Sequence, residues 1–169
     1  MTRMKLGSLV IGLSVVAALV GPGALRGQDV DDREAEEQAV AVIERLFDAM
    51  RASDSLTVRG LFADGVTQFG SSYTSRDAGP AVGIMTLEEF VVAVGGAEVG
   101  TLDERIIVRD VIVDDNLVTV ITPYTFHFDG NLSHCGVDVF LVARTGEDWK
   151  IVSLADTRRR AGCEGWLNE

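Results

Sequence analysis

Cysteine and histidine are scarce in this 169-residue sequence, which contains two of each. Cys135 and Cys163 are too far apart for a redox Cys-x-x-Cys motif or a zinc cluster. Basic residues are also few, 15 against 26 acidic ones, which gives a formal net charge of -11. Because an acidic chain repels phosphate backbones, we expect no nucleic acid as a partner. The length suits one well-cored domain and excludes a large multidomain enzyme.

The first 28 residues differ from the rest of the chain because they contain no acidic residue. Arg3 and Lys5 precede the apolar run Leu6–Val20, and a segment of glycine, proline and alanine follows it. This order is typical of a secretory signal peptide, with cleavage expected between Ala24 and Gln28. The run is shorter than the roughly 20 residues of a membrane span, so we expect no stable membrane insertion after cleavage. An uncleaved membrane anchor is the alternative.

We therefore divide the chain into a signal peptide, 1–28, and one domain, 29–169, that is secreted or periplasmic. All 26 acidic residues and 12 of the 15 basic ones lie in this domain. In an oxidising compartment an even pair of cysteines is a disulfide candidate. Cys135 and Cys163 are thus a candidate disulfide, and two packed free thiols are the alternative.

The first half of the domain has the spacing of amphipathic helices. Apolar residues three and four apart predict a helix over 31–51, and Ser53-Asp54 ends it and caps a short second helix. Residues 66–69 are predicted to form a short strand that leads into a loop. The segment Thr86-Leu87-Glu88-Glu89 has the form of a capping box, which predicts a third helix.

The second half consists of β-branched runs separated by turn signals at 114–116, 129–131 and 145–148. This pattern predicts a four-stranded antiparallel meander from about Glu104 onward. Helices followed by a long curled sheet indicate an α+β domain whose amino-terminal helices pack on a curved antiparallel sheet.

Two-residue hairpins would fix the register of this meander. Arg105 would face Phe126, Phe126 would face Cys135, and Cys135 would face Arg158. One face would then gather a polar end on an apolar surface, formed by Arg105, Tyr124, Phe126, Asp156 and Arg158. We predict that Arg105, Phe126 and Arg158 line a ligand pocket there.

The opposite face would carry Glu104, His127, His134 and Asp138. The first three could form half of a metal site, but residues beside a turn are more often solvated, and we expect no metal. Both faces are too apolar to contact water, so we expect one to pack under the helices and the other to form a homodimer through the sheet. A bulge at Pro123 would move Tyr124 and Phe126 to the other face.

Several stretches resemble the nuclear transport factor 2-like superfamily, in particular its exported members. They are Pro123-Tyr124-Thr125-Phe126 through Asp129-Gly130, Ser133-His134-Cys135-Gly136-Val137-Asp138, Trp149-Lys150-Ile151-Val152 and Ala155-Asp156-Thr157-Arg158-Arg159. The element order over about 33–160 is also similar. This resemblance implies the cone-shaped, cystatin-like α+β barrel shared by ketosteroid isomerases, scytalone dehydratase, limonene epoxide hydrolase and polyketide-cyclase-like proteins. The fold hosts enzymes, ligand carriers and dimerisation modules alike.

The resemblance also implies a type of chemistry. Enzymes of this fold hold polar side chains inside a cone whose apolar walls raise carboxyl pKa values. The candidate catalytic residues are Tyr124 with Asp156, or His134 with Asp138, acting on a small hydrophobic molecule without any cofactor. Isomerisation, dehydration and cyclisation are the expected reactions. The pattern of the ketosteroid isomerases does not transfer, because the first helix here has no tyrosine, and the epoxide hydrolase arrangement has no clear match.

A bland interpretation accompanies each candidate. Asp156 could pair with Arg105 or Arg158, and Tyr124 could be a core aromatic whose hydroxyl finds a backbone partner. The alternative function is a non-catalytic dimeric interaction module of the cell envelope, whose acidic surface binds a basic partner.

Overall fold

In the described part of the chain, three helices precede the long strands: α1 (Asp32–Arg51), α2 (Ser55–Leu61) and, after one hairpin, α3 (Leu87–Gly95). The computed structural model describes residues 31–75 and 79–168, and the predicted signal peptide lies outside these residues. Among the described residues, no helix has the length and apolarity to cross a bilayer.

Local sequence explains where each helix begins. The carboxylate of Asp31 accepts a hydrogen bond from the Arg33 backbone N–H at the start of α1, and Asp54 does the same for Thr57 in α2. The bonds from Thr57 lower the pKa of Asp54. The predicted capping box of α3 is confirmed, because Thr86 and Glu89 each accept from the other's backbone N–H.

Seven strands form one curved, unclosed sheet, whose order is β2-β1-β7-β6-β5-β3, with β4 also paired to β5. All pairs are antiparallel except β1 with β7. The strands are β1 (Gln68–Ser75), β2 (Gly79–Thr86), β3 (Leu102–Ile106), β4 (Asp110–Asp114), β5 (Leu117–Phe128), β6 (Asn131–Thr145) and β7 (Asp148–Arg158). The predicted α+β class, with helices on a curved antiparallel sheet, is confirmed.

Two strand predictions were incomplete. The segment predicted as a short strand and a loop is the hairpin β1–β2, whose Gly- and Ser-rich sequence has weak β propensity and is held in the sheet by pairing with β7. The meander has five strands rather than four, because β3 and β4 both pair along the long strand β5.

The register differs by one residue from the prediction at each of the tested pairs. Glu104 rather than Arg105 faces Phe126, and His134 rather than Cys135 faces Phe126. The register shifts between Phe126 and His127 and between Leu141 and Val142, not at Pro123. A one-residue slip moves a side chain to the other face of a sheet. His134 and Glu104 therefore share the face of Phe126, which the prediction did not expect.

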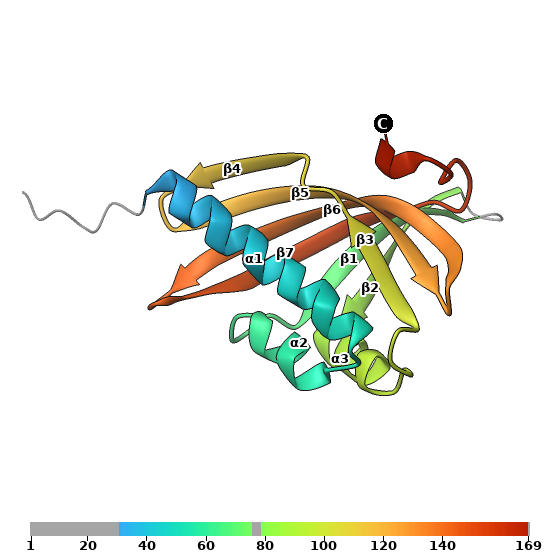
Figure 1. Cartoon of the computed structure of the whole chain (residues 1–169), viewed down its shortest axis with the longest axis horizontal. Coiled ribbons are helices and arrows are strands. Elements are labelled where there is room, and N and C mark those ends of the chain that lie inside the picture. Colours follow the sequence, from blue (N-terminus) through green and yellow to red (C-terminus); the bar gives the residue numbers. More distant parts are fainter. Residues whose placement is uncertain (1–30, 76–78, 169) are drawn as a thin grey trace, which may run out of the picture.

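The helices pack against the concave face of the sheet, which α1 crosses (Figure 1). Phe47 of α1 meets Phe140 of β6 edge to face, with ring centroids 6.1 Å apart. The buried side of α1 consists of Ala35, Ala39, Val42, Ile43, Leu46, Phe47, Ala49 and Met50. These residues and the inward side chains of β5, β6 and β7 form the apolar core.

The chain after β7 folds back toward β5 and β6 and ends in a short 3-10 helix, η1 (Trp166–Asn168). A disulfide joins Cys135 of β6 to Cys163 in this segment, with Cα atoms 5.5 Å apart. Side chains alternate along a strand, so Cys135 points away from the face on which His134 lies. The carboxy-terminal segment is thus attached to the face opposite the helices.

Candidate functional site

A cavity of about 180 Å³ lies between the concave face of the sheet and helices α1 and α3. Most of its wall is apolar, formed by Leu46, Phe47, Met50, Phe69, Met85, Phe90, Ala93, Val94, Leu102, Phe126, Phe140 and Leu154. Its ionisable lining residues are Glu104, His134, Asp138, Asp156 and Arg158. An apolar hollow with a few polar groups is the usual form of a small-molecule site.

Strand periodicity brings these ionisable residues together. Glu104 and His134 both pair with Phe126, one from β3 and the other from β6. Asp138 of β6 pairs with Asp156 of β7. Residues two apart on a strand share a face, so His134 and Asp138 line the cavity from β6 and Asp156 and Arg158 line it from β7.

The carboxyl groups of Asp138 and Glu104 lie close together in the cavity wall, and each affects the pKa of the other. Burial, and then the charge of Glu104, raise the pKa of Asp138 well above its ordinary value. Burial, and then the charge of Asp156, raise the pKa of Glu104 to about 8. The pair therefore retains a proton at neutral pH. Thr122 donates a further hydrogen bond, of 3.3 Å, to Asp138 Oδ2.

Asp156 has a different environment, because Arg158 Nε donates to its Oδ2 at 2.6 Å. Burial disfavours the Arg158 cation, but the hydrogen bond and charge of Asp156 outweigh it and raise the pKa of Arg158. Asp156 Oδ1 is buried and accepts no hydrogen bond from any described residue. Asp156 thus keeps one carboxylate oxygen without a partner.

Tyr124 lies behind this ion pair with only 1% of its surface exposed. Its hydroxyl donates to the Thr157 carbonyl oxygen at 2.9 Å and lies 3.4 Å from Asp156 Oδ2. Burial, and then the charge of Asp156, raise its pKa. Tyr124 is not among the residues that line the cavity. The predicted neighbours Tyr124 and Asp156 are therefore close, and the tyrosine bonds the strand that carries Asp156.

His134 is a neutral imidazole at neutral pH. Burial, and then the charge of Arg158, lower its pKa to about 4. Its ring packs against Phe126 with centroids 5.0 Å apart, and its Nδ1 lies 3.1 Å from Ser133 Oγ. His134 and Asp138 both line the cavity, but Asp138 accepts from Thr122 and His134 contacts Ser133, so among the described residues no hydrogen bond from Asp138 orients the imidazole.

Arg105 lies outside the cavity, contrary to the predicted pocket. It pairs with Thr125 of β5, and its side chain is 59% exposed and forms an ion pair of 2.8 Å with Asp103. Glu104 takes the inward position that the prediction gave to Arg105. The predicted register already placed Glu104 and His134 on the same face of the sheet, which is correct. It was wrong in placing Phe126 on the other face.

Among the described residues, no group of three or more His, Cys, Asp or Glu side chains is arranged to hold a metal ion. His127 takes no part in the cavity lining and does not face His134, because the register shifts between Phe126 and His127. Glu104, His127 and His134 therefore do not form the half-site considered from the sequence.

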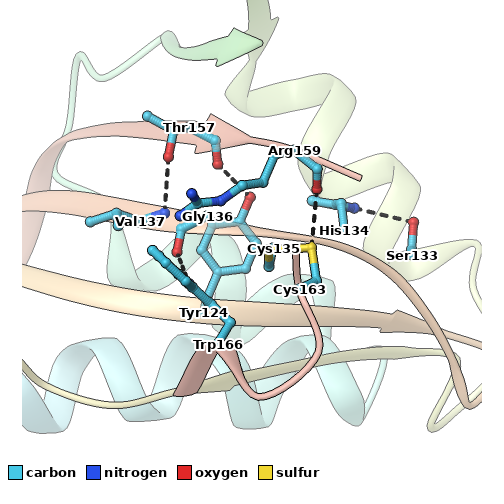
Figure 2. The surroundings of a disulfide bond; sticks show 10 residues. All are labelled: Tyr124, Ser133, His134, Cys135, Gly136, Val137, Thr157, Arg159, Cys163 and Trp166. Carbon is cyan, nitrogen blue, oxygen red and sulfur yellow. Dashed lines mark hydrogen bonds between the residues drawn. A yellow bond between two sulfur atoms is a disulfide. The ribbon is translucent and has the colours of Figure 1, made fainter. Parts of the chain in front are cut away.

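The disulfide is attached to β6 at Cys135, directly after the cavity-lining His134 (Figure 2). Backbone bonds of 3.0 Å join Cys135 and Arg159 in both directions, and Cys163 Sγ lies 3.4 Å from the Arg159 carbonyl oxygen. Trp166 Nε1 donates to the Gly136 carbonyl oxygen at 2.9 Å, and the Arg159 guanidinium lies 3.6 Å from the centre of the Trp166 ring. The carboxy-terminal segment therefore fixes the end of β7 beside Arg158.

No protein-family model and no curated protein sequence matches the chain. Solved structures do. An NTF2-like protein of unknown function from Silicibacter pomeroyi DSS-3 has a TM-score of 0.59 at 15% identity, covering 77% of this chain and all (100%) of its own. A cystatin-like domain from Nostoc punctiforme PCC 73102 has a TM-score of 0.52 at 18% identity, covering 74% and 78%.

A third structure, a proposed dehydratase of the NTF2-like family from Streptomyces avermitilis, has a TM-score of 0.51 at 16% identity. It covers 78% of this chain and 100% of its own. Likeness at this level of identity is a likeness of fold. The chain therefore has the fold of nuclear transport factor 2-like proteins.

Proposed function

We propose that the domain binds a small, mainly apolar molecule in its cavity and acts on it by acid/base chemistry that needs no cofactor. The observation that carries this proposal is the pair of neighbouring carboxyl groups, Glu104 and Asp138, at the wall of an apolar cavity. Carboxyl groups whose pKa values are raised by burial are candidates for proton transfer near neutral pH.

Two carboxyl environments suit two roles. Asp138, protonated within its pair with Glu104, would donate a proton or hydrogen bond to a ligand oxygen. Asp156, paired with Arg158, would accept a proton from the ligand. Isomerisation, dehydration and cyclisation each combine such a donation with such a removal. The proposed dehydratase among the similar structures is in keeping with this class of reaction.

His134 and Tyr124 would have supporting roles. His134, neutral at pH 7, would contact the ligand as a hydrogen-bonding wall, since it lines the cavity. Tyr124 would position Asp156 through its hydrogen bond to the neighbouring Thr157 carbonyl oxygen. Phe126 and Arg158 would complete the ligand pocket.

We further propose that the protein is exported, by cleavage of residues 1–28, and forms a homodimer through the outer face of its sheet. The disulfide is consistent with an oxidising compartment. On the outer face, Val139 is 39% exposed and pairs with Ile121 and with the exposed Ala155. An interaction module without catalysis is not favoured, because such a module does not require titratable side chains around an internal cavity.

A thermal-shift screen of small lipophilic compounds tests the binding function. The screen would compare the natural protein with Asp138→Asn, which changes the cavity wall, and with Asp110→Asn, a control on the exposed strand β4. We expect compounds that stabilise the natural protein and the control equally and Asp138→Asn less. If no compound stabilises any of the three proteins, the domain has no binding function of this kind.

A further inference from the structure

The volume of the cavity limits the size of its ligand. At about 180 Å³, it slightly exceeds the roughly 150 Å³ of an engineered cavity that binds benzene. A single six-membered ring with one or two substituent atoms fits such a space, as does a short aliphatic chain. Fused ring systems of three or four rings would require the helices to move away from the sheet.

The charges around the cavity limit the charge of the ligand. Arg158 offsets the charge of Asp156, His134 is neutral, and the Glu104–Asp138 pair retains a proton. The lining therefore carries no net positive charge that would favour an anion. An anionic ligand would lie beside the Asp156 carboxylate, and its transfer into an apolar cavity would be unfavourable. A neutral ligand avoids both costs.

Hydrogen-bonding capacity limits the functional group of the ligand. The Asp156 side chain is only 9% exposed, and its Oδ1 atom is buried and accepts no hydrogen bond within the described part of the chain. A buried acceptor without a donor is unfavourable. The terminal torsion of an aspartate is soft, so a small rotation would turn Oδ1 toward a ligand donor.

Asp138 offers the complementary group on the adjacent strand. It pairs directly with Asp156, and such cross-strand neighbours have Cβ atoms about 5 Å apart. Burial and the neighbouring Glu104 raise the pKa of Asp138, so its carboxyl group carries a proton that it can donate in a hydrogen bond. One ligand oxygen that both donates and accepts would therefore satisfy the two aspartates at once.

We propose that the cavity selects neutral alcohols of one ring or a short chain, whose hydroxyl group donates to Asp156 and accepts from Asp138. The apolar remainder of the ligand lies against Phe47, Phe140 and Leu154. This inference rests on the proposed binding function and names the class of molecule that it serves.

Isothermal titration calorimetry of the protein with four matched probes tests whether the cavity selects alcohols. The probes share one ring and differ in one group: cyclohexylmethanol, methylcyclohexane, cyclohexanecarboxylate and cyclohexylmethylamine. We expect the alcohol to bind at least tenfold more tightly than each of the other three. Equal or tighter binding of the hydrocarbon, the acid or the amine would overturn the proposal.

Three variants locate the bound alcohol. Leu154→Phe narrows the cavity and should abolish binding of all probes. Asp138→Leu removes the donor and should reduce the affinity for the alcohol at least tenfold while leaving that for the hydrocarbon unchanged, whereas Asp138→Asn keeps an N–H donor and should retain most of the preference. Binding of the alcohol that is unaffected by Leu154→Phe would contradict the assignment.

The outcomes separate this inference from the function on which it rests. If no probe binds and the screen of lipophilic compounds also fails, the binding function itself is wrong. If the hydrocarbon binds as tightly as the alcohol and Leu154→Phe abolishes both, the cavity binds ligands and only the selection for alcohols is wrong. Asp110→Asn serves as the control and should bind every probe as the natural protein does.

Discussion

Asp138 and Asp156 lie directly opposite each other on β6 and β7, and both line the cavity. Two like charges at such a position destabilise a sheet. The surrounding residues remove the conflict in two ways, since burial raises the pKa of Asp138 so that it stays protonated, and Asp156 forms an ion pair with Arg158. Two identical side chains on adjacent strands therefore have different hydrogen-bonding roles.

The proton retained by the Glu104 and Asp138 carboxyl groups makes stability depend on pH. The pKa of Glu104 rises from 4.5 to about 8 on folding, so between these values the folded state binds more protons than the unfolded state. The free energy of unfolding therefore falls as pH rises through this window, by at most about 1.4 kcal/mol per pH unit for each retained proton. Denaturant unfolding at several pH values would measure this slope.

His134 has the opposite effect at lower pH, because its pKa falls from 6.5 to about 4 on folding and its contribution grows as pH rises. The effect of the carboxyl pair should consequently be clearest between pH 6.5 and 8. Glu104→Gln should flatten the slope there, whereas Glu98→Gln, outside the cavity, should leave it unchanged. A slope that is unchanged in Glu104→Gln would show that Glu104 does not titrate in this window, whereas a smaller remaining slope belongs to Asp138, whose pKa is also raised.

Gly136 permits the close approach of β6, β7 and Tyr124. A Cβ atom at this position would lie 1.7 Å from the Thr157 carbonyl oxygen and 2.9 Å from Tyr124 Cε1. Gly136→Ala should therefore displace the end of β7 and lower the free energy of unfolding by about 3 kcal/mol. Gly60→Ala is the matched control, because a Cβ atom there meets nothing within 4 Å. Gly60 lies in helix α2, where replacing glycine by alanine should leave the free energy of unfolding unchanged or raise it by up to about 1 kcal/mol.

The disulfide closes a loop between residues 28 positions apart. Replacing both cysteines by serine should lower the free energy of unfolding by about 3 kcal/mol. The loss should also loosen the carboxy-terminal segment, since Trp166 and Arg159 hold it by only a few further contacts. Hydrogen exchange would detect faster exchange of the backbone amides at positions 135 and 159, which bond each other's carbonyl groups in the natural protein. Unchanged exchange at both residues would show that the segment does not need the disulfide.

Removal of the Tyr124 hydroxyl should affect the site through the backbone. Tyr124→Phe leaves the Thr157 carbonyl oxygen without this donor, which should cost about 1–2 kcal/mol of stability. Tyr73→Phe, at a 40% exposed position on β1, should change stability by less than about 0.5 kcal/mol. Equal losses in the two variants, measured by thermal unfolding, would show that the buried bond has no special weight.

Capping signals and apolar spacing were sufficient to predict the helices. Asp54 and the Thr86–Glu89 capping box mark helix starts that depend on local hydrogen bonds alone. The hairpin β1–β2 was not predicted as two strands, because its support comes from parallel pairing with β7, far away in the sequence. Local propensity contains no information on such a pairing.

The site was predictable only in part because register depends on bulges. Between β5 and β6 the prediction was one residue out, which put His134 and Asp138 on the wrong face relative to Tyr124. The prediction was also one residue out between β6 and β7, whose register shifts at Leu141. The two errors cancel, so Asp156 and Arg158 were correctly placed on the face of Phe126. Only one register error affected Glu104, so it was placed on the wrong face and was not predicted to line the cavity.

The protonation state of Asp138 at neutral pH is the central claim, because both the proposed chemistry and the selection of alcohols need its proton. Carbon-13 NMR of protein labelled at the side-chain carboxyl carbons of Asp and Glu would follow each group from pH 4 to 9. We predict that the Asp138 signal stays in its protonated position through pH 7, and that Glu104 titrates near pH 8. Titration of Asp138 near pH 4, with no Asp or Glu carboxyl titrating above pH 6, would contradict the account.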